Sequence, residues 1–86
     1  TMAGPYVERE LALVKVNGAG EKRVEALRIA DIFKARVVDA SHEHFVFEMT
    51  GKTDKLDAFV ELMSPLGLID VSRTGVVAIQ RGPEGL

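Results

Sequence analysis

Apolar and polar positions alternate along the chain with two different periods, which predicts a mixed α/β domain. Residues 10–16 form an extended segment whose two alternating sets of positions are both apolar. A strand with one face in water would alternate more strictly, so we expect this strand to be covered on both sides. Residues 21–34 have helical spacing instead. The apolar stripe of this predicted helix contains Val24, Leu27 and Ala30, together with Ala26, Ile29 and Phe33.

The middle of the chain predicts an antiparallel hairpin. Residues 36–41 and 45–50 both have strand character, and only His42-Glu43-His44 separates them. A connection this short joins neighbouring antiparallel strands.

A second helix and a last extended segment follow. Leu56, Phe59, Val60 and Met63 stand at helical spacing, and Ser64-Pro65 ends the pattern. Thr53 or Asp54 can cap this helix at its start. Residues 68–81 are extended, with an interruption at 73–75, so the last strand is either long or split in two.

The resulting order is β-α-β-β-α-β, which predicts an α+β domain with the ferredoxin-like βαββαβ arrangement. Two helices would cover one face of a four-stranded antiparallel sheet and leave the other face bare. Apolar residues nevertheless occupy both sides of the first strand and of 76–79. Because large exposed apolar patches are uncommon in monomers, we expect a second subunit to cover this face, and a homodimer is the simplest arrangement.

The ends of the chain carry less pattern than its middle. Thr1 precedes Met2, and Ala3-Gly4-Pro5 is typical of a flexible lead-in. We therefore expect residues 1–8 to be a tag or linker remnant, residues 9–82 to form the domain, and residues 83–86 to be a tail. On this interpretation the chain is a fragment of a longer protein.

Composition excludes several classes of function. The 86 residues carry a net charge of −2, which disfavours nucleic acid as a partner. The chain has no cysteine, and so no disulfide, thiolate metal site or cysteine nucleophile. Its apolar runs are far shorter than the roughly 20 residues that span a membrane. We expect neither a nucleic-acid nor a membrane partner.

His42 and His44 are the candidate metal ligands, because two imidazoles at i and i+2 can share an ion. A closed site needs three or four ligands, and the chain has no other histidine. Glu43 or a histidine from another chain would have to complete the site. A solvated hairpin turn is therefore the favoured interpretation, and we expect no metal.

Two further groups of residues are candidates for chemistry or binding. Asp39 and Glu48 could act as acid and base across the hairpin, but we favour carboxylates that face outward or form an ion pair with Arg36 or Arg73. The glycine-rich turn 17–20 could bind an anion at the following helix. It lacks the P-loop lysine and the full dinucleotide fingerprint, so we favour a role in turn geometry alone.

No convergent set of acid, base and nucleophile is present in the sequence, so we predict no catalytic residue and no cofactor. Arginines flank the final strand and can contact a carboxylate of another protein. The residues that we predict to bind a partner are Arg73 and Arg81, with apolar support from Val77 and Ile79.

Four runs together resemble the C-terminal half of the acetolactate (acetohydroxyacid) synthase small subunit. They are 9–16 (RELALVKV), 31–41 (DIFKARVVDAS), 50–59 (with TG and DKLDAF) and 73–82 (RTGVVAIQRG). The resemblance covers nearly all of residues 9–82, in the order and spacing of that family.

The resemblance implies a regulatory, non-catalytic role in the cytoplasm, in the biosynthesis of branched-chain amino acids. In that family an N-terminal ACT domain holds the inhibitor valine, and a second ferredoxin-like domain follows it. The subunit binds and activates a catalytic large subunit that uses thiamine diphosphate. The ACT half has no counterpart here, so the resemblance assigns valine to no residue of this chain.

An alternative from a different class is a free-standing sensor domain of ferredoxin-like fold that responds to a ligand or a metal. It would use either the His42/His44 turn or the glycine-rich turn. Binding of nickel, zinc or a branched-chain amino acid by this chain alone would distinguish it from the regulatory domain.

Overall fold

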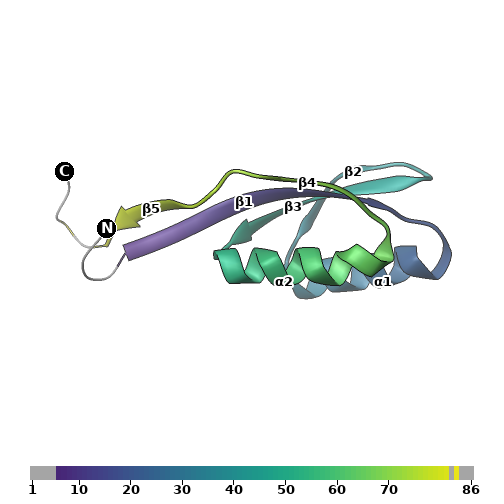
Figure 1. Ribbon diagram of the computed structural model, residues 1–86, viewed down its shortest axis with the longest axis horizontal. Coiled ribbons are helices and arrows are strands. Elements are labelled where there is room, and N and C mark those ends of the chain that lie inside the picture. Colours follow the sequence, from purple (N-terminus) through teal and green to yellow (C-terminus); the bar gives the residue numbers. More distant parts are fainter. Residues whose placement is uncertain (1–5, 82, 84–86) are drawn as a thin grey trace.

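The computed structural model describes residues 6–81 and residue 83, and shows a sheet with two helices on one face (Figure 1). The elements are β1 (Tyr6–Asn17), α1 (Gly20–Ile32), β2 (Arg36–Ala40), β3 (His44–Gly51), α2 (Thr53–Met63), the short 3-10 helix η1 (Ser64–Leu66), β4 (Leu68–Arg73) and β5 (Val77–Gln80). The main sheet has the strand order β2-β3-β1-β4, and each neighbouring pair is antiparallel. The predicted ferredoxin-like α+β fold is thereby confirmed.

The predicted last strand is split, and its two parts pair with different parts of β1. β4 pairs with the segment from Ala12 to Val16, and β5 pairs with Tyr6–Arg9. Between them, Thr74 donates its backbone N–H to the carbonyl of Leu11. Both parts therefore follow one side of β1, with an irregularity at residues 74–76.

The first strand begins earlier than the sequence indicates. The sequence pattern places residues 6–8 in a linker, but they belong to β1 and form a regular ladder with β5. Their alternation alone does not predict a strand, because the partner strand lies some 70 residues further along the chain. Residues 1–5 and most of the predicted tail at 83–86 lie outside the described residues.

The core lies between the helices and the sheet. β1 contributes Val14 and Val16 and β3 contributes Phe47 and Met49, all of them almost completely buried. They meet three residues of the predicted stripe of α2, namely Leu56, Phe59 and Met63. The rings of Phe47 and Phe59 meet edge to face with centroids 6.0 Å apart, a favourable arrangement for aromatic pairs.

Helix α1 is rotated relative to its predicted position. Ala26, Ile29 and Ala30 face the sheet, whereas Val24 is 68% exposed and Leu27 is 37% exposed. Of the predicted apolar stripe, Val24 and Leu27 therefore lie outside the buried core. Apolar residues surround too much of this helix for periodicity to fix its inner face, and two small alanines allow a close approach to the sheet.

Candidate functional site

The most exposed apolar residues of the described chain lie on a two-stranded extension of the sheet. This arm consists of Tyr6–Arg9 of β1 and the whole of β5, and it projects beyond both helices (Figure 1). Val77 is 69% exposed and Ile79 is 70% exposed. An isolated two-stranded ribbon is marginally stable in water. The arm therefore has the character of a surface that another protein covers.

One face of the arm continues the uncovered face of the main sheet. Val7 lies opposite Ile79, and Arg9 lies opposite Val77. Because side chains alternate along a strand, Val7 and Arg9 share their face with Leu11 and Leu13. The helices cover the other face, so this series is the uncovered one.

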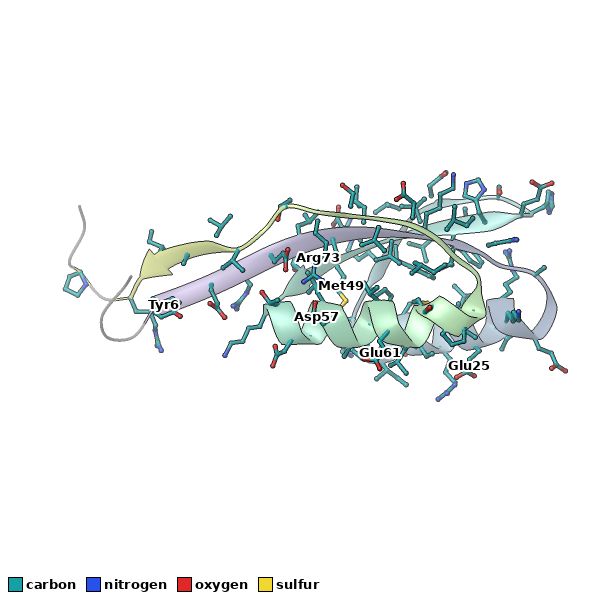
Figure 2. All side chains as sticks on the ribbon, viewed as in Figure 1. Tyr6, Glu25, Met49, Asp57, Glu61 and Arg73 are labelled. Atoms are coloured by element: carbon teal, nitrogen blue, oxygen red, sulfur yellow. The ribbon has the colours of Figure 1, made fainter. Side chains whose placement is uncertain are left out.

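A cluster of charged side chains ties the base of the arm to the body. This junction cluster consists of Glu10, Asp57, Arg73 and the backbone of Gly75. Arg73 donates to the Glu10 carboxylate at 2.6 Å and to Asp57 on α2 at 2.5 Å, and Figure 2 shows it reaching towards Asp57. The second oxygen of Glu10 accepts the backbone N–H of Gly75 at 3.1 Å. Three segments that converge at the arm are thus joined.

The electrostatics of the junction cluster favour its charged form. Glu10 is only 6% exposed, yet the hydrogen bond from Arg73 outweighs this burial and lowers the pKa of its carboxyl group. Hydrogen bonds to Glu10 and then to Asp57 raise the pKa of the Arg73 guanidinium. A charge this well paired stabilises the junction between arm and body.

Arg73 therefore pairs within the chain with Glu10 and Asp57, whereas the sequence pattern offered Asp39 or Glu48 as its partner. Contact with a partner stays a prediction for all four residues. Arg81, Val77 and Ile79 are exposed, and so are accessible to a partner. Sequence reasoning missed Glu10 and Asp57. One signal for Glu10 was available, because it is the one acid in the inward series that continues with Ala12, Val14 and Val16.

The histidine pair lies at the β2–β3 turn. His44 Nδ1 is 2.9 Å from the Ser41 hydroxyl and its Nε2 is 3.4 Å from Asp39, while His42 is exposed. Within residues 6–81 and 83, no group of three or more His, Cys, Asp or Glu side chains is placed to hold a metal. The two histidines therefore have no third ligand among these residues.

The strand carboxylates have separate neighbours. Glu48 lies 4.0 Å from Arg36, as one of the two favoured pairings predicted, and Asp39 contacts His44. The cross-strand register places Glu48 opposite Arg36 and Asp39 opposite Val46. The arrangement is that of surface ion pairs.

The glycine-rich turn before α1 is closely packed. A Cβ atom on the buried Gly18 would lie 2.9 Å from the ring of Phe45. Asn17 donates its backbone N–H to the carbonyl of Gly67 at 2.7 Å, and Gly18 donates to Glu43 at 3.1 Å. These contacts fit the interpretation that the glycines serve turn geometry.

No helix in the described part of the chain is long and apolar enough to cross a membrane. The exposed apolar surface of the arm lies on a short two-stranded ribbon. Its extent suits contact with another protein.

Comparison with known proteins gives a consistent result. The family model for the small subunit of acetolactate synthase matches residues 9–82. A probable acetolactate synthase small subunit from Archaeoglobus fulgidus is 47% identical over 76 residues, which are 88% of this chain and 48% of that protein. The small subunit from Aquifex aeolicus is 47% identical over 78 residues, which are 90% of this chain and 41% of that protein.

A solved structure agrees with these sequence matches. The crystal structure of the acetolactate synthase small subunit from Thermotoga maritima superimposes with a TM-score of 0.83 at 35% identity, over 92% of this chain and 48% of that one. The chain spans about half the length of the relatives that it matches. It belongs to the family of acetolactate synthase small subunits.

Proposed function

We propose that this chain is a non-catalytic domain of an acetolactate synthase regulatory subunit, which forms homodimers and helps bind and activate the catalytic large subunit. The observation that carries the proposal is the family match over residues 9–82 together with the related fold. On this proposal the thiamine-diphosphate chemistry takes place on the large subunit, in the cytoplasm and in branched-chain amino-acid biosynthesis. Valine binds to an ACT domain outside these residues.

The domain acts by differential binding. A protein without a catalytic group can raise the activity of another only if it binds the active state more tightly than the inactive state. Arg81 at the end of the arm supplies a contact for a carboxylate of the large subunit. Arg73 acts through the junction cluster, because Glu10 and Asp57 already occupy its guanidinium.

The test is activation of a purified catalytic subunit from a related organism. We expect added chain to bind this subunit and to raise its rate of acetolactate formation, while the chain alone forms none. Arg81→Ala should weaken activation. Arg36→Ala is the matched control, because it removes another exposed arginine at the far edge of the sheet.

Two results would contradict the proposal. The first is an absence of both binding and activation by the unaltered chain. The second is acetolactate formation by the chain alone. Heat released on titration with nickel, zinc or a branched-chain amino acid would instead favour the sensor function.

A further inference from the structure

We infer that the free edge of β1 at Tyr6–Arg9 is the docking site for an extended, acidic segment of the catalytic large subunit, which adds to the arm as a third strand. The inference rests on the function proposed above, and it names the surface and the kind of segment. β3 accompanies β1 only as far as Gly51, which lies opposite Glu10. Figure 1 shows β1 and β5 continuing beyond the tip of β3. Within residues 6–81 and 83, no strand lies beside Tyr6–Arg9 on this side of β1.

The backbone of Glu8 directs its hydrogen-bonding groups towards this open edge. Leu11 donates its N–H to the Thr74 hydroxyl and accepts the Thr74 N–H at its carbonyl, both on the side of β4 and β5. Successive residues of a strand point these groups to opposite sides. The groups of Val7 and Arg9 therefore face β5, and those of Glu8 face the side of β3. An added strand would pair with the N–H and the C=O of Glu8.

A side chain of the chain itself partly protects this edge. Arg9 donates from its Nη1 to the carbonyl oxygen of Glu8 at 2.7 Å, and this contact is exposed. Proteins commonly protect open sheet edges with charged side chains, because such an edge can pair with any strand. An incoming strand would replace this contact with its own N–H. The Arg9 guanidinium would then bind a carboxylate on that strand, so it selects for an acidic segment.

The charges around the edge also favour an acidic segment. Lys52 is exposed and directly follows β3. The stem of Lys55 lies over the end of β3, where its Cδ is 3.2 Å from a Cβ atom built on the last residue of that strand. Together with Arg9, three cations border the place of the added strand. Glu8 and Asp54 are the acids beside it, so the balance is positive and complements a carboxylate.

The opposite edge of the arm, along β5, is less suited to an added strand. β5 follows an irregular stretch at 74–76, where Gly75 has φ = +81°. On the other side β1 is continuous from Tyr6 to Asn17, and the added strand would lie in line with β3. Four residues of edge match a segment about 13 Å long. A third strand would also stabilise the arm, because a two-stranded ribbon is marginal in water.

Two proline variants at facing positions of the arm test this edge. Glu8 and Ala78 lie opposite each other in the ladder, and the N–H of each points away from the other strand. Glu8→Pro thus removes a donor from the β1 edge, and Ala78→Pro removes one from the β5 edge. We expect Glu8→Pro to raise the Kd of the complex with purified catalytic large subunit about tenfold or more. Ala78→Pro should leave this Kd unchanged.

The control for the lost side chain is Glu8→Ala, which keeps the backbone N–H. It should bind the large subunit at least as tightly as the unaltered chain does. Arg9→Glu should raise the Kd about tenfold or more, because it sets a carboxylate against those of the docking segment. Arg36→Glu, at the far edge of the sheet, should leave the Kd unchanged. Circular dichroism establishes that each variant is folded.

Hydrogen exchange measures the same edge in the unaltered chain. Addition of the large subunit should slow exchange of the Glu8 amide about tenfold or more, because the added strand accepts this N–H. The Ala78 amide, on the opposite edge, should exchange as it does in the free chain. This measurement decides the matter alone if Glu8→Pro does not fold.

The outcomes separate this edge from the proposed function. Absence of any complex with the large subunit would overturn the proposed function and the edge with it. A complex that tolerates Glu8→Pro, that Ala78→Pro weakens as much, or that leaves the Glu8 amide unprotected would overturn the edge alone. Protection of that amide at high chain concentration without the large subunit would assign the edge to a second copy and also overturn the inference.

Discussion

Replacing Gly67 with alanine should destabilise the domain strongly, because two separate costs fall on this residue. Gly67 has φ = +95°, and a Cβ atom there would lie 2.6 Å from the backbone oxygen of Asn17. The left-handed conformation costs a non-glycine residue about 1–2 kcal/mol. Moving the two segments apart also stretches the 2.7 Å hydrogen bond from Asn17 to the Gly67 carbonyl, which contributes about 0.5–1.5 kcal/mol.

Gly75 provides the matched control, because it carries the first cost without the second. Its φ is +81°, but nothing lies within 4 Å of a Cβ atom built on it. Alanine also restricts the unfolded chain at both sites, which returns about 0.4–1 kcal/mol. The net loss is then about 1 kcal/mol for Gly75→Ala and about 2 kcal/mol for Gly67→Ala.

Thermal unfolding followed by circular dichroism at one protein concentration measures this difference. In a domain of this size, 1 kcal/mol corresponds to about 4–8 °C in Tm. We expect Gly67→Ala to melt roughly 4–8 °C below Gly75→Ala. Equal Tm values for the two variants would refute the argument from close contact and leave backbone conformation as the sole cost.

Three other outcomes follow from the burial and pairing of particular residues. The pKa of Glu10 is lowered from 4.5 in the folded state, so its contribution to stability is present above pH 4.5 and is lost as the pH falls through the folded pKa. Glu10→Gln should therefore flatten the fall of Tm below about pH 5. An unchanged slope of Tm against pH would contradict the pairing with Arg73. Phe47 is fully buried, so Phe47→Ala should lower the free energy of unfolding, measured in urea, by about 3–5 kcal/mol. A loss below about 1 kcal/mol would show that the core is wrongly placed. Arg28→Ala removes an exposed pair with Glu25 and should leave Tm unchanged; a clear fall would show that this surface pair stabilises the helix.

Hydrophobic periodicity predicted the buried face of an element correctly where only one rotation of that element buries its apolar residues. Leu56, Phe59 and Met63 are buried as their spacing indicated, because the charged residues of α2 all lie off their stripe. The same reasoning failed for Val24, since α1 has apolar residues around much of its circumference and several rotations would bury some of them. The glycine-rich turn at 17–20 was visible in the sequence itself, and Gly18 there packs closely against Phe45.

Contacts between distant segments could not be predicted in this way. Arg73 lies 63 residues from Glu10 and 16 from Asp57 along the chain. Their meeting depends on the registers of two strand pairs and on the position of a helix start. A single-residue shift in either register would turn a side chain to the other face of the sheet. The sequence therefore indicated Arg73 as a candidate for an ion pair, but it could not specify the residues that pair with it.

The junction cluster gives the exposed arm a defined direction, and this links the charged residues to assembly. Glu10 holds Arg73 and the Gly75 backbone at the point where the ladder passes from β4 to β5. A ribbon that swung freely from this point would lose conformational entropy whenever a partner ordered it, and its binding would weaken accordingly. Fixing the ribbon in the free chain removes most of that cost. Arg73 can therefore be essential for contact with a partner without touching the partner.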